Sequence, residues 1–259
     1  MKSFAVISRP DEHSKMLSDI IEKKLVSIGY RNEEQAVDLC VVVGGDGTFL
    51  RAVQQHKAWL TKTAFIGIHT GTLGFFSGYY EEEIDQFFED IQEKEMIIKE
   101  ADLLEVTRLG SSEKLMALNE IRVENSTKTQ VLDITVNEEF FEQYHGTGIC
   151  IATQLGSTAY NRSIQGAVVA EGLSVMQISE IAGIHHNKYH SLGSSLIVPA
   201  DAVIQLHSSD FEGAVLCADS QCVSLQKEET ITCRKSSIKV RIAQYKTVSY
   251  LSKVKGLFS

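Results

Sequence analysis

A strand-like run that ends in a glycine-rich turn is the feature that most limits how this chain of 259 residues can fold. Val41–Val43 are β-branched, Gly44, Gly45 and Gly47 follow at once, and spacing typical of a helix resumes over residues 49–53. The pattern predicts a strand, a tight turn and a helix. Glycines in such a turn let backbone N–H groups approach a ligand closely, and the N-terminus of the following helix favours anions. The sequence therefore predicts phosphate binding here.

Asp46 is the one carboxylate set among these glycines. A carboxylate beside bound phosphate is costly unless it takes a proton, holds a metal ion or orients a hydroxyl group. Asp46 is therefore the candidate catalytic residue. The alternative interpretation is structural, with Asp46 as the N-cap of the helix.

Strand-like and helix-like segments alternate over roughly the first hundred residues, which predicts a Rossmann-like α/β domain with a parallel sheet over residues 1–98. Helices are expected over residues 11–28 and 82–94. The first should bury one broad apolar face, and the second should turn Ile84, Phe87, Phe88 and Ile91 inward. The inward residues expected in the first helix are Met16, Ile20, Ile21, Leu25 and Ile28.

From residue 99 the pattern changes to many short strand candidates separated by turns, which predicts an all-β sandwich over residues 99–244. Only two short helices are expected there, near residues 159–169 and 174–182. The final stretch, residues 245–259, mixes apolar residues with lysines and is expected to form a packed amphipathic tail.

Composition limits the partners and the compartment. The net charge is −9 and the pI is about 5.4, which argues against a nucleic-acid-binding surface. No apolar run approaches the twenty residues that a membrane span needs, and the N-terminal residues are expected to form a strand rather than a signal peptide. Five cysteines without a Cys-x-x-Cys pair suggest neither a disulfide framework nor a zinc site, and Cys40 and Cys150 look like core residues. We expect a cytoplasmic protein.

Three further segments carry binding chemistry, each with a plainer alternative. Residues 67–76 form a second glycine-rich loop after a strand, although glycine turns of this kind are common without a ligand. Asn119 and Glu120, between two strand candidates, can grip a ribose or can form a surface turn. Residues 156–163 can bind phosphate and stack a base, or can be an N-cap with a core tyrosine. His185, His186 and His190 are expected to form a polar loop, and no metal site is predicted.

Taken together, these segments resemble the NAD kinases, which phosphorylate NAD on its adenosine ribose. The motifs agree in order and spacing across roughly residues 41–220. They are Gly-Gly-Asp-Gly-Thr at 44–48, Gly-Thr-Leu-Gly-Phe at 71–75, Leu-Asn-Glu at 118–120 and Gly-Ser-Thr-Ala-Tyr-Asn at 156–161. A stretch at 176–182 fits as well. The resemblance implies an α/β domain followed by an NAD-binding β-sandwich, with the C-terminal tail, residues 245–259, packing back on the α/β domain.

The resemblance also implies roles for individual residues. Asp46 would orient or deprotonate the ribose 2′-hydroxyl, Gly45 and Gly47 would line the ATP phosphates, and Arg51 would contact nucleotide phosphate. Phe75 would pack on adenine, and Asn119 and Glu120 would hold the adenosine. The remaining positions implied to contact the dinucleotide are His145, Thr147, Thr158, Ala159, Tyr160, Asn161, Arg162, Ser163 and Ala182.

The chain departs from the family pattern in one segment. Many bacterial relatives have Arg-Gly-Asp-Gly where this chain has His-Gly-Thr-Gly at 145–148, and a common histidine near Asp219 is Ser220. We expect these changes to affect affinity for the dinucleotide more than phosphoryl transfer.

The sequence leaves three functions open. They are an NAD kinase, a dinucleotide-binding sensor without turnover, and a related kinase for another hydroxyl acceptor such as a lipid. For the kinase, NAD and ATP are the expected substrates, with polyphosphate as an alternative donor. Mg²⁺ or another divalent cation would arrive with ATP. The many strand candidates with few covering helices predict a homo-oligomer. The resemblance implies a homodimer or homotetramer.

Overall fold

The computed structural model describes residues 2–71, 74–185 and 189–256 and divides into two compact units. The first unit combines residues 1–101 with residues 238–259, and the second spans residues 102–237. Two long strands, β6 (Ile97–Arg108) and β16 (Glu229–Gln244), each run from one unit into the other. The C-terminal segment therefore joins the first unit from residue 238, before the expected start of the tail near residue 245.

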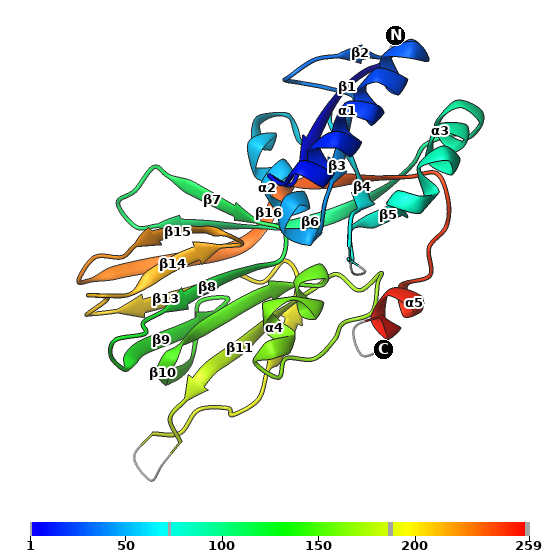
Figure 1. Ribbon diagram of the computed structural model, residues 1–259. Coiled ribbons are helices and arrows are strands. Elements are labelled where there is room, and N and C mark those ends of the chain that lie inside the picture. The colour runs from blue at the N-terminus through cyan, green and yellow to red at the C-terminus, as the bar shows by residue number, and fades with distance from the viewer. Residues whose placement is uncertain (1, 72–73, 186–188, 257–259) are drawn as a thin grey trace. The chain divides into compact units, whose positions relative to one another are not determined.

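The first unit is a parallel α/β layer (Figure 1). Its strands follow the order β2-β1-β3-β4, and both β5 and the end of β16 pair with β4 in the parallel sense. Its other elements are β1 (Ser3–Ser8), α1 (Glu12–Ser27), β2 (Arg31–Asn32), β3 (Leu39–Val43), α2 (Asp46–Gln55), a 3₁₀ turn (Lys57–Trp59), β4 (Ala64–His69), β5 (Ser77–Tyr80), a second 3₁₀ turn (Glu81–Glu83), α3 (Ile84–Glu93) and α5 (Tyr250–Lys255).

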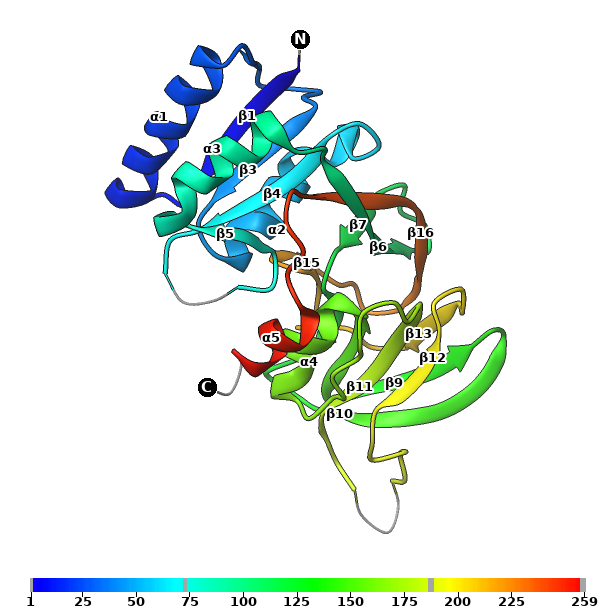
Figure 2. The ribbon, with the colours of Figure 1, turned by 90° about the vertical axis from the view of Figure 1, so that its right-hand side faces the viewer.

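Alternation along the buried strands sorts their side chains onto two faces. Leu39, Val41 and Val43 of β3 pack in one cluster with residues from α1 and α3, which lie together on one face of the sheet (Figure 2). On the other face, Phe49 of α2 contacts Phe65 of β4, with ring centroids 5.9 Å apart. Helices thus cover both faces, as a parallel sheet requires.

The predicted α3 face is confirmed, but the predicted α1 face is partly wrong. Met16 and Ile20 are 66% and 54% exposed, whereas Ile21 and Leu25 are fully buried. The buried stripe continues through Ser14 and Ser18. Positions 14, 18, 21 and 25 share one face of the helix, so Met16 and Ile20 lie outside the buried face.

The second unit is β-rich and almost entirely antiparallel. Its apolar core includes Tyr144, Ile134 and Phe211, all fully buried. Its elements, apart from β6 and β16, are β7 (Lys114–Ala117), β8 (Glu120–Glu124), β9 (Gln130–Val136), β10 (Glu139–Thr153), the 3₁₀ turn η3 (Leu155–Thr158), α4 (Tyr160–Ser163), β11 (Val175–Gly183), β12 (Leu196–Pro199), β13 (Ile204–Ser208), β14 (Val215–Ala218) and β15 (Gln221–Ser224).

Two helix predictions in this unit need correction. The segment expected to be helical at 174–182 is β11, which pairs with both β10 and β12. A short apolar run fits a buried strand as well as a helix, and here the tertiary pairing decides. The helix expected near 159–169 is only the single turn α4.

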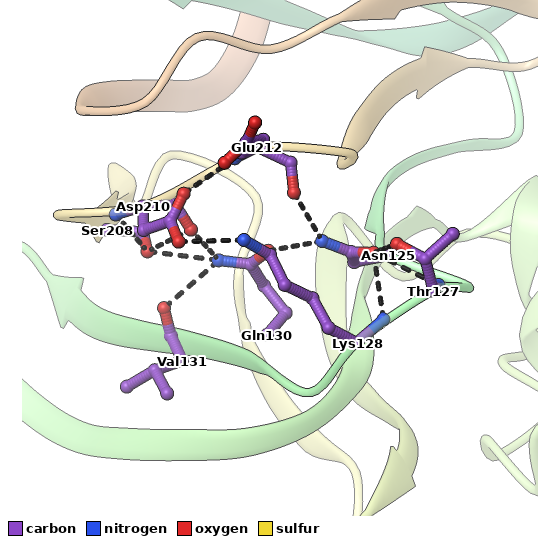
Figure 3. A network of polar contacts seen from close by, with 8 residues as sticks. All are labelled: Asn125, Thr127, Lys128, Gln130, Val131, Ser208, Asp210 and Glu212. Atoms are coloured by element: carbon purple, nitrogen blue, oxygen red, sulfur yellow. Dashed lines mark hydrogen bonds and ion pairs between the residues drawn. The ribbon is translucent and has the colours of Figure 1, made fainter.

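A polar network fastens two turns of the second unit (Figure 3). The Asn125 carboxamide oxygen accepts from the Lys128 backbone N–H, and its NH₂ group donates to the Glu212 carbonyl at 3.1 Å. Gln130 donates to the Asp210 carbonyl at 2.9 Å, and the Lys128 ammonium lies 2.7 Å from the Asp210 carboxylate. Side chains thereby satisfy backbone groups that no strand partner reaches.

The expectation of no disulfide is wrong. Cys217 and Cys222 form a disulfide across the β14–β15 hairpin, where the two residues face each other directly. The spacing of five residues is what a short hairpin requires, and sequence alone does not reveal the turn. Cys40, Cys150 and Cys233 are free and buried, which confirms the first two as core residues. Within the described ranges, no helix is long and apolar enough to cross a membrane.

Substituting two residues of α1 separates buried from exposed positions. Leu25→Ala should lower the free energy of unfolding by about 2–5 kcal/mol, because it removes a fully buried side chain and leaves a cavity. Met16→Ala should change it by less than about 0.5 kcal/mol, because Met16 is mostly exposed. Equilibrium denaturation of both variants checks this. Equal losses would mean that α1 is rotated from the position described.

Candidate active site

The glycine turn presents Asp46 at the start of α2, where the first residue of the helix follows the buried strand β3. Its carboxylate accepts hydrogen bonds from the backbone N–H groups of Phe75 (2.9 Å) and Phe76 (3.1 Å). The N-cap of α2 is Gly45, and no side chain caps the helix. The alternative in which Asp46 serves as the N-cap is therefore wrong.

Two glycines make this arrangement possible. Gly44 has φ +146°, a conformation that side chains rarely adopt, and a Cβ there would lie 2.6 Å from the Thr48 hydroxyl. A Cβ on Gly74 would lie 2.5 Å from Asp46 Oδ1. Gly47 differs, because a Cβ there would meet no atom within 4 Å. The open space beside Gly47 is on the exposed side of the turn.

His69, at the end of β4, completes the polar groups around the turn and was assigned no role from sequence. The Cβ position on Gly74 is also 2.9 Å from the His69 ring, so the ring flanks the Asp46 carboxylate. Burial lowers the pKa of His69, although the nearby Asp46 charge acts in the opposite direction. A neutral imidazole at neutral pH follows.

Arg51 and Phe75 are both engaged within the first unit. The Arg51 guanidinium donates to the Ser8 carbonyl at the end of β1, while its Nε is buried without a hydrogen-bond partner among the described residues. The Phe75 ring meets Tyr250 of α5 edge-on at 6.1 Å, and the Lys253 ammonium donates to the Phe75 carbonyl at 2.6 Å. Thr72 and Leu73, part of the predicted second loop, lie outside the described residues.

In the second unit, Asn119 and Glu120 lie where β7 leads into β8, and both are buried. Burial, with a further contribution from the Asp219 charge, raises the pKa of Glu120 to about 7. Its Oε2 is buried without a hydrogen-bond partner among the described residues. A buried acceptor of this kind is costly unless a donor reaches it, which suits a ligand hydroxyl.

Arg122 is a member of this site that sequence reasoning missed. Its guanidinium lies 4.4 Å from the centre of the Tyr160 ring and 3.8 Å from the Glu120 carboxylate, and it also pairs with Glu124. The sequence could have revealed Arg122, because a strand over these residues puts positions 120, 122 and 124 on one face. The Arg122 guanidinium therefore lies between the carboxylates of Glu120 and Glu124.

The other residues predicted around α4 divide into two groups. Thr158, Ala159 and Tyr160 are half-buried, and Arg162 and Ser163 are exposed. Asn161 is fully buried and accepts a hydrogen bond from the Ser179 hydroxyl at 2.6 Å. The Asn161 amide nitrogen is buried without a hydrogen-bond partner among the described residues.

The segment that departs from the family pattern lies on β10. The His145 ring stacks on Tyr189 at 3.9 Å, and the Thr147 carbonyl accepts from the Asn125 N–H at 2.8 Å. Ala182, on the neighbouring strand β11, is exposed and has φ +49°.

The histidine loop lies partly within the described residues. His185 Nε2 is 3.4 Å from Glu180, whereas His186 is not among the described residues. Over the described ranges, no three histidine, cysteine or acidic side chains gather as metal ligands.

Comparison with protein families matches both halves of the chain. The ATP-NAD kinase N-terminal domain matches residues 5–96, and the ATP-NAD kinase C-terminal domain matches residues 118–245. The NAD kinase of Geobacillus stearothermophilus is 34% identical, with 98% of this chain and 96% of the relative covered. NAD kinase 1 of Halalkalibacterium halodurans is also 34% identical, with 98% of each chain covered.

Solved structures have the same fold. The NAD kinase from Archaeoglobus fulgidus in complex with ATP matches with a TM-score of 0.77 at 24% identity, covering 98% of this chain and 99% of that chain. Yeast NADH kinase complexed with NADH matches with a TM-score of 0.78 at 17% identity, covering 98% and 86% respectively.

Two glycine substitutions test the geometry around Asp46. Gly74→Ala should lower the free energy of unfolding by about 1–3 kcal/mol, because its methyl group would collide with Asp46 Oδ1 and the His69 ring. Gly47→Ala should raise it by about 0.5–1 kcal/mol, because the methyl group meets open space and alanine favours the helix. Urea denaturation measures both. Two changes of the same sign would contradict the described turn.

Proposed function

The chain belongs to the NAD kinase family, and on that premise we propose that it transfers the γ-phosphoryl group of ATP to the adenosine-ribose 2′-hydroxyl of NAD, giving NADP. The observation that carries the proposal is the Asp46 carboxylate, fixed by two backbone N–H groups inside a glycine turn. A carboxylate so placed has its oxygens oriented before the substrate arrives. Preorganisation of this kind is the main source of catalysis in phosphoryl transfer.

In this proposal Asp46 orients the acceptor hydroxyl and takes its proton as the new P–O bond forms. The bond between the γ-phosphorus and the β–γ bridging oxygen of ATP breaks, and ADP leaves. Gly45 and Gly47 lie at the N-terminus of α2, where backbone N–H groups and the helix dipole favour the phosphates. Arg51, one turn along the helix, adds positive charge nearby.

In this proposal, residues of the second unit bind the dinucleotide. Glu120 Oε2, which lacks a hydrogen-bond partner among the described residues, accepts from ribose hydroxyls, and Asn119 holds the adenosine beside it. The half-buried Tyr160 ring stacks on an adenine, with Arg122 over the ring. Phe75 packs on the adenine side of NAD. The further proposed contacts are Thr158, Ala159, Asn161, Arg162, Ser163, His145, Thr147 and Ala182.

A divalent cation belongs to the donor in this scheme, and we propose Mg²⁺. The described residues offer no cluster of three metal ligands, so the ion would enter bound to the ATP phosphates as part of the substrate. It would neutralise charge on the phosphate oxygens during transfer. We further propose that the enzyme acts in the cytoplasm.

Replacing Asp46 tests the proposed chemistry. Asp46→Asn should lower kcat for NADP formation about 10²–10⁴-fold, because the amide cannot take the proton. The variant should still fold with a lower melting temperature, because the amide oxygen can accept only one of the two N–H groups of Phe75 and Phe76. Asp11→Asn is the matched control. Asp11 also accepts a backbone N–H at a helix start, from Ser14 at 2.9 Å, and asparagine caps equally well. An NADP-specific dehydrogenase coupled to the reaction reports the rate. Near-parental turnover in Asp46→Asn would assign Asp46 a purely structural role.

We also propose that the chain forms a homodimer or homotetramer. Exposed apolar residues on the second unit, including Ile197 and Phe140, leave strand surface for a partner copy. Sedimentation velocity at micromolar concentration should give a mass of two or four chains. A fully active species with the mass of a single chain of 28.7 kDa would refute the proposal.

A further inference from the structure

Asp219, at the tip of the β14–β15 hairpin, is tied to the segment that carries Asn119 and Glu120. Its carboxylate accepts from the backbone N–H groups of Leu118 (2.8 Å), Asn119 (2.8 Å) and Glu120 (3.2 Å). The Asp219 N–H donates in return to the Glu120 carbonyl at 3.0 Å. Four hydrogen bonds therefore join two segments about a hundred residues apart in the sequence.

Asp219 is 5% exposed, so its charge is held almost without water. Burying a carboxylate is expensive unless hydrogen-bond donors surround it. The three N–H groups supply most of the compensation for Asp219, and the charge of the nearby Arg122 adds a smaller favourable contribution. Burial raises the pKa of Asp219, and these hydrogen bonds act in the opposite direction. Burying the Asp219 carboxylate costs free energy, and its three hydrogen bonds fix its position relative to residues 118–120.

The hairpin that holds Asp219 cannot easily slide along β8. Cys217 pairs with Arg122 and Ala218 with Ile121 in an antiparallel register. The Cys217–Cys222 disulfide closes the two arms of the hairpin just behind its tip. Asp219 itself has φ +50°, a left-handed conformation that aspartate and asparagine tolerate better than most residues.

We propose that Asp219 is a positioning residue, which fixes the backbone of Asn119 and Glu120 so that both side chains are presented to the ribose of the dinucleotide. The proposal rests on the function proposed above and adds a residue with no predicted contact to substrate. Without Asp219, three N–H groups would lose their acceptor, and the junction between β7 and β8 would be free to shift. A displacement of about 1 Å in a positioning group can cost about 100-fold.

The charge of Asp219 gives the proposal a second, electrostatic consequence. It faces Glu120 and contributes to the raised pKa of Glu120, which is about 7. An ionised Glu120 is the stronger acceptor for ribose hydroxyls, so NAD affinity should rise as the pH rises through 7. Removing the Asp219 charge should move this transition to lower pH. The other titratable groups that bear on Glu120 are Arg122 and Glu124 of β8 and Cys150 of β10, and the Tyr160 backbone N–H also donates to the Glu120 carboxylate.

Asp219→Asn is the direct test, because asparagine keeps the size and the left-handed backbone but loses the charge and one acceptor. Isothermal titration should show NAD affinity weakened by about 10–100-fold, with ATP affinity within about twofold of the parent. The midpoint of the pH dependence of NAD affinity should move below that of the parent. Glu120→Gln should remove this pH dependence in both the parent and the Asp219→Asn background.

Asp210→Asn is the matched control. Asp210 is also a turn aspartate of the second unit that accepts a backbone N–H, from Glu212 at 2.9 Å, but it is exposed and belongs to the network of Figure 3. It should leave NAD affinity and its pH midpoint unchanged. A general loosening of the β-rich unit would instead weaken binding in both variants.

The outcomes separate the two proposals. If the parent chain binds no NAD, the proposed function fails. If the parent binds NAD and a folded Asp219→Asn variant binds it equally tightly with the same pH midpoint, the positioning role is overturned. Should Asp219→Asn not fold, Asp219→Glu keeps the charge but displaces it by one methylene. The role then requires weakened NAD binding with unchanged ATP binding, and parental NAD affinity would overturn it.

Discussion

Carboxylates that accept backbone N–H groups from a distant segment are the interaction on which the site depends. Asp46 accepts from Phe75 and Phe76, and Asp219 accepts from Leu118, Asn119 and Glu120. In each unit one acidic side chain thereby fixes a loop that would otherwise have unpaired N–H groups. Charge-assisted bonds of this kind are roughly twice as strong as neutral ones. Each unit thus uses a carboxylate to hold the backbone of a distant segment, Phe75 and Phe76 in the first unit and Leu118, Asn119 and Glu120 in the second.

The buried acid Glu120 makes the stability of the folded protein depend on pH. Its pKa in the folded protein, about 7, is above its ordinary value of 4.5. The folded state therefore binds its proton more tightly than the unfolded chain does. This stabilisation is fully present below pH 4.5 and is lost as the pH rises through 7, where Glu120 ionises inside the protein. In the proposed complex, a ribose hydroxyl that donates to the Glu120 carboxylate would offset that loss of stability.

Local sequence patterns predicted much of the fold and only part of the site. The strand, glycine turn and helix around Asp46 follow from β-branched residues and glycines within a dozen positions. The burial of Phe87 and Ile91 likewise follows from helical spacing. The α1 face was misjudged, because serines at 14 and 18, rather than large apolar residues, lie against the sheet. The β11 strand was missed, because pairing with β10 and β12 overrides an ambiguous local pattern.

The missed site residues have different causes. Arg122 could have been predicted from the sequence, since a strand beginning at Glu120 places Arg122 on the same face as Glu120. The contacts of Asp219 could not have been predicted, because its partners lie about a hundred residues away and no local sequence pattern indicates them. His69 was visible in the second glycine loop, but its approach to Asp46 depends on Gly74, five residues further on. Contacts between distant segments are set by topology, which a single sequence does not reveal.

Phosphorus NMR of the reaction itself tests the central claim most directly. The purified chain would be incubated with NAD, ATP and Mg²⁺, and the phosphorus signals followed over time. The account predicts loss of the ATP γ-phosphate signal together with the growth of one new phosphomonoester signal that matches the 2′-phosphate of NADP. Conversion of ATP to ADP and inorganic phosphate without a new ester, or an ester at another hydroxyl, would contradict it.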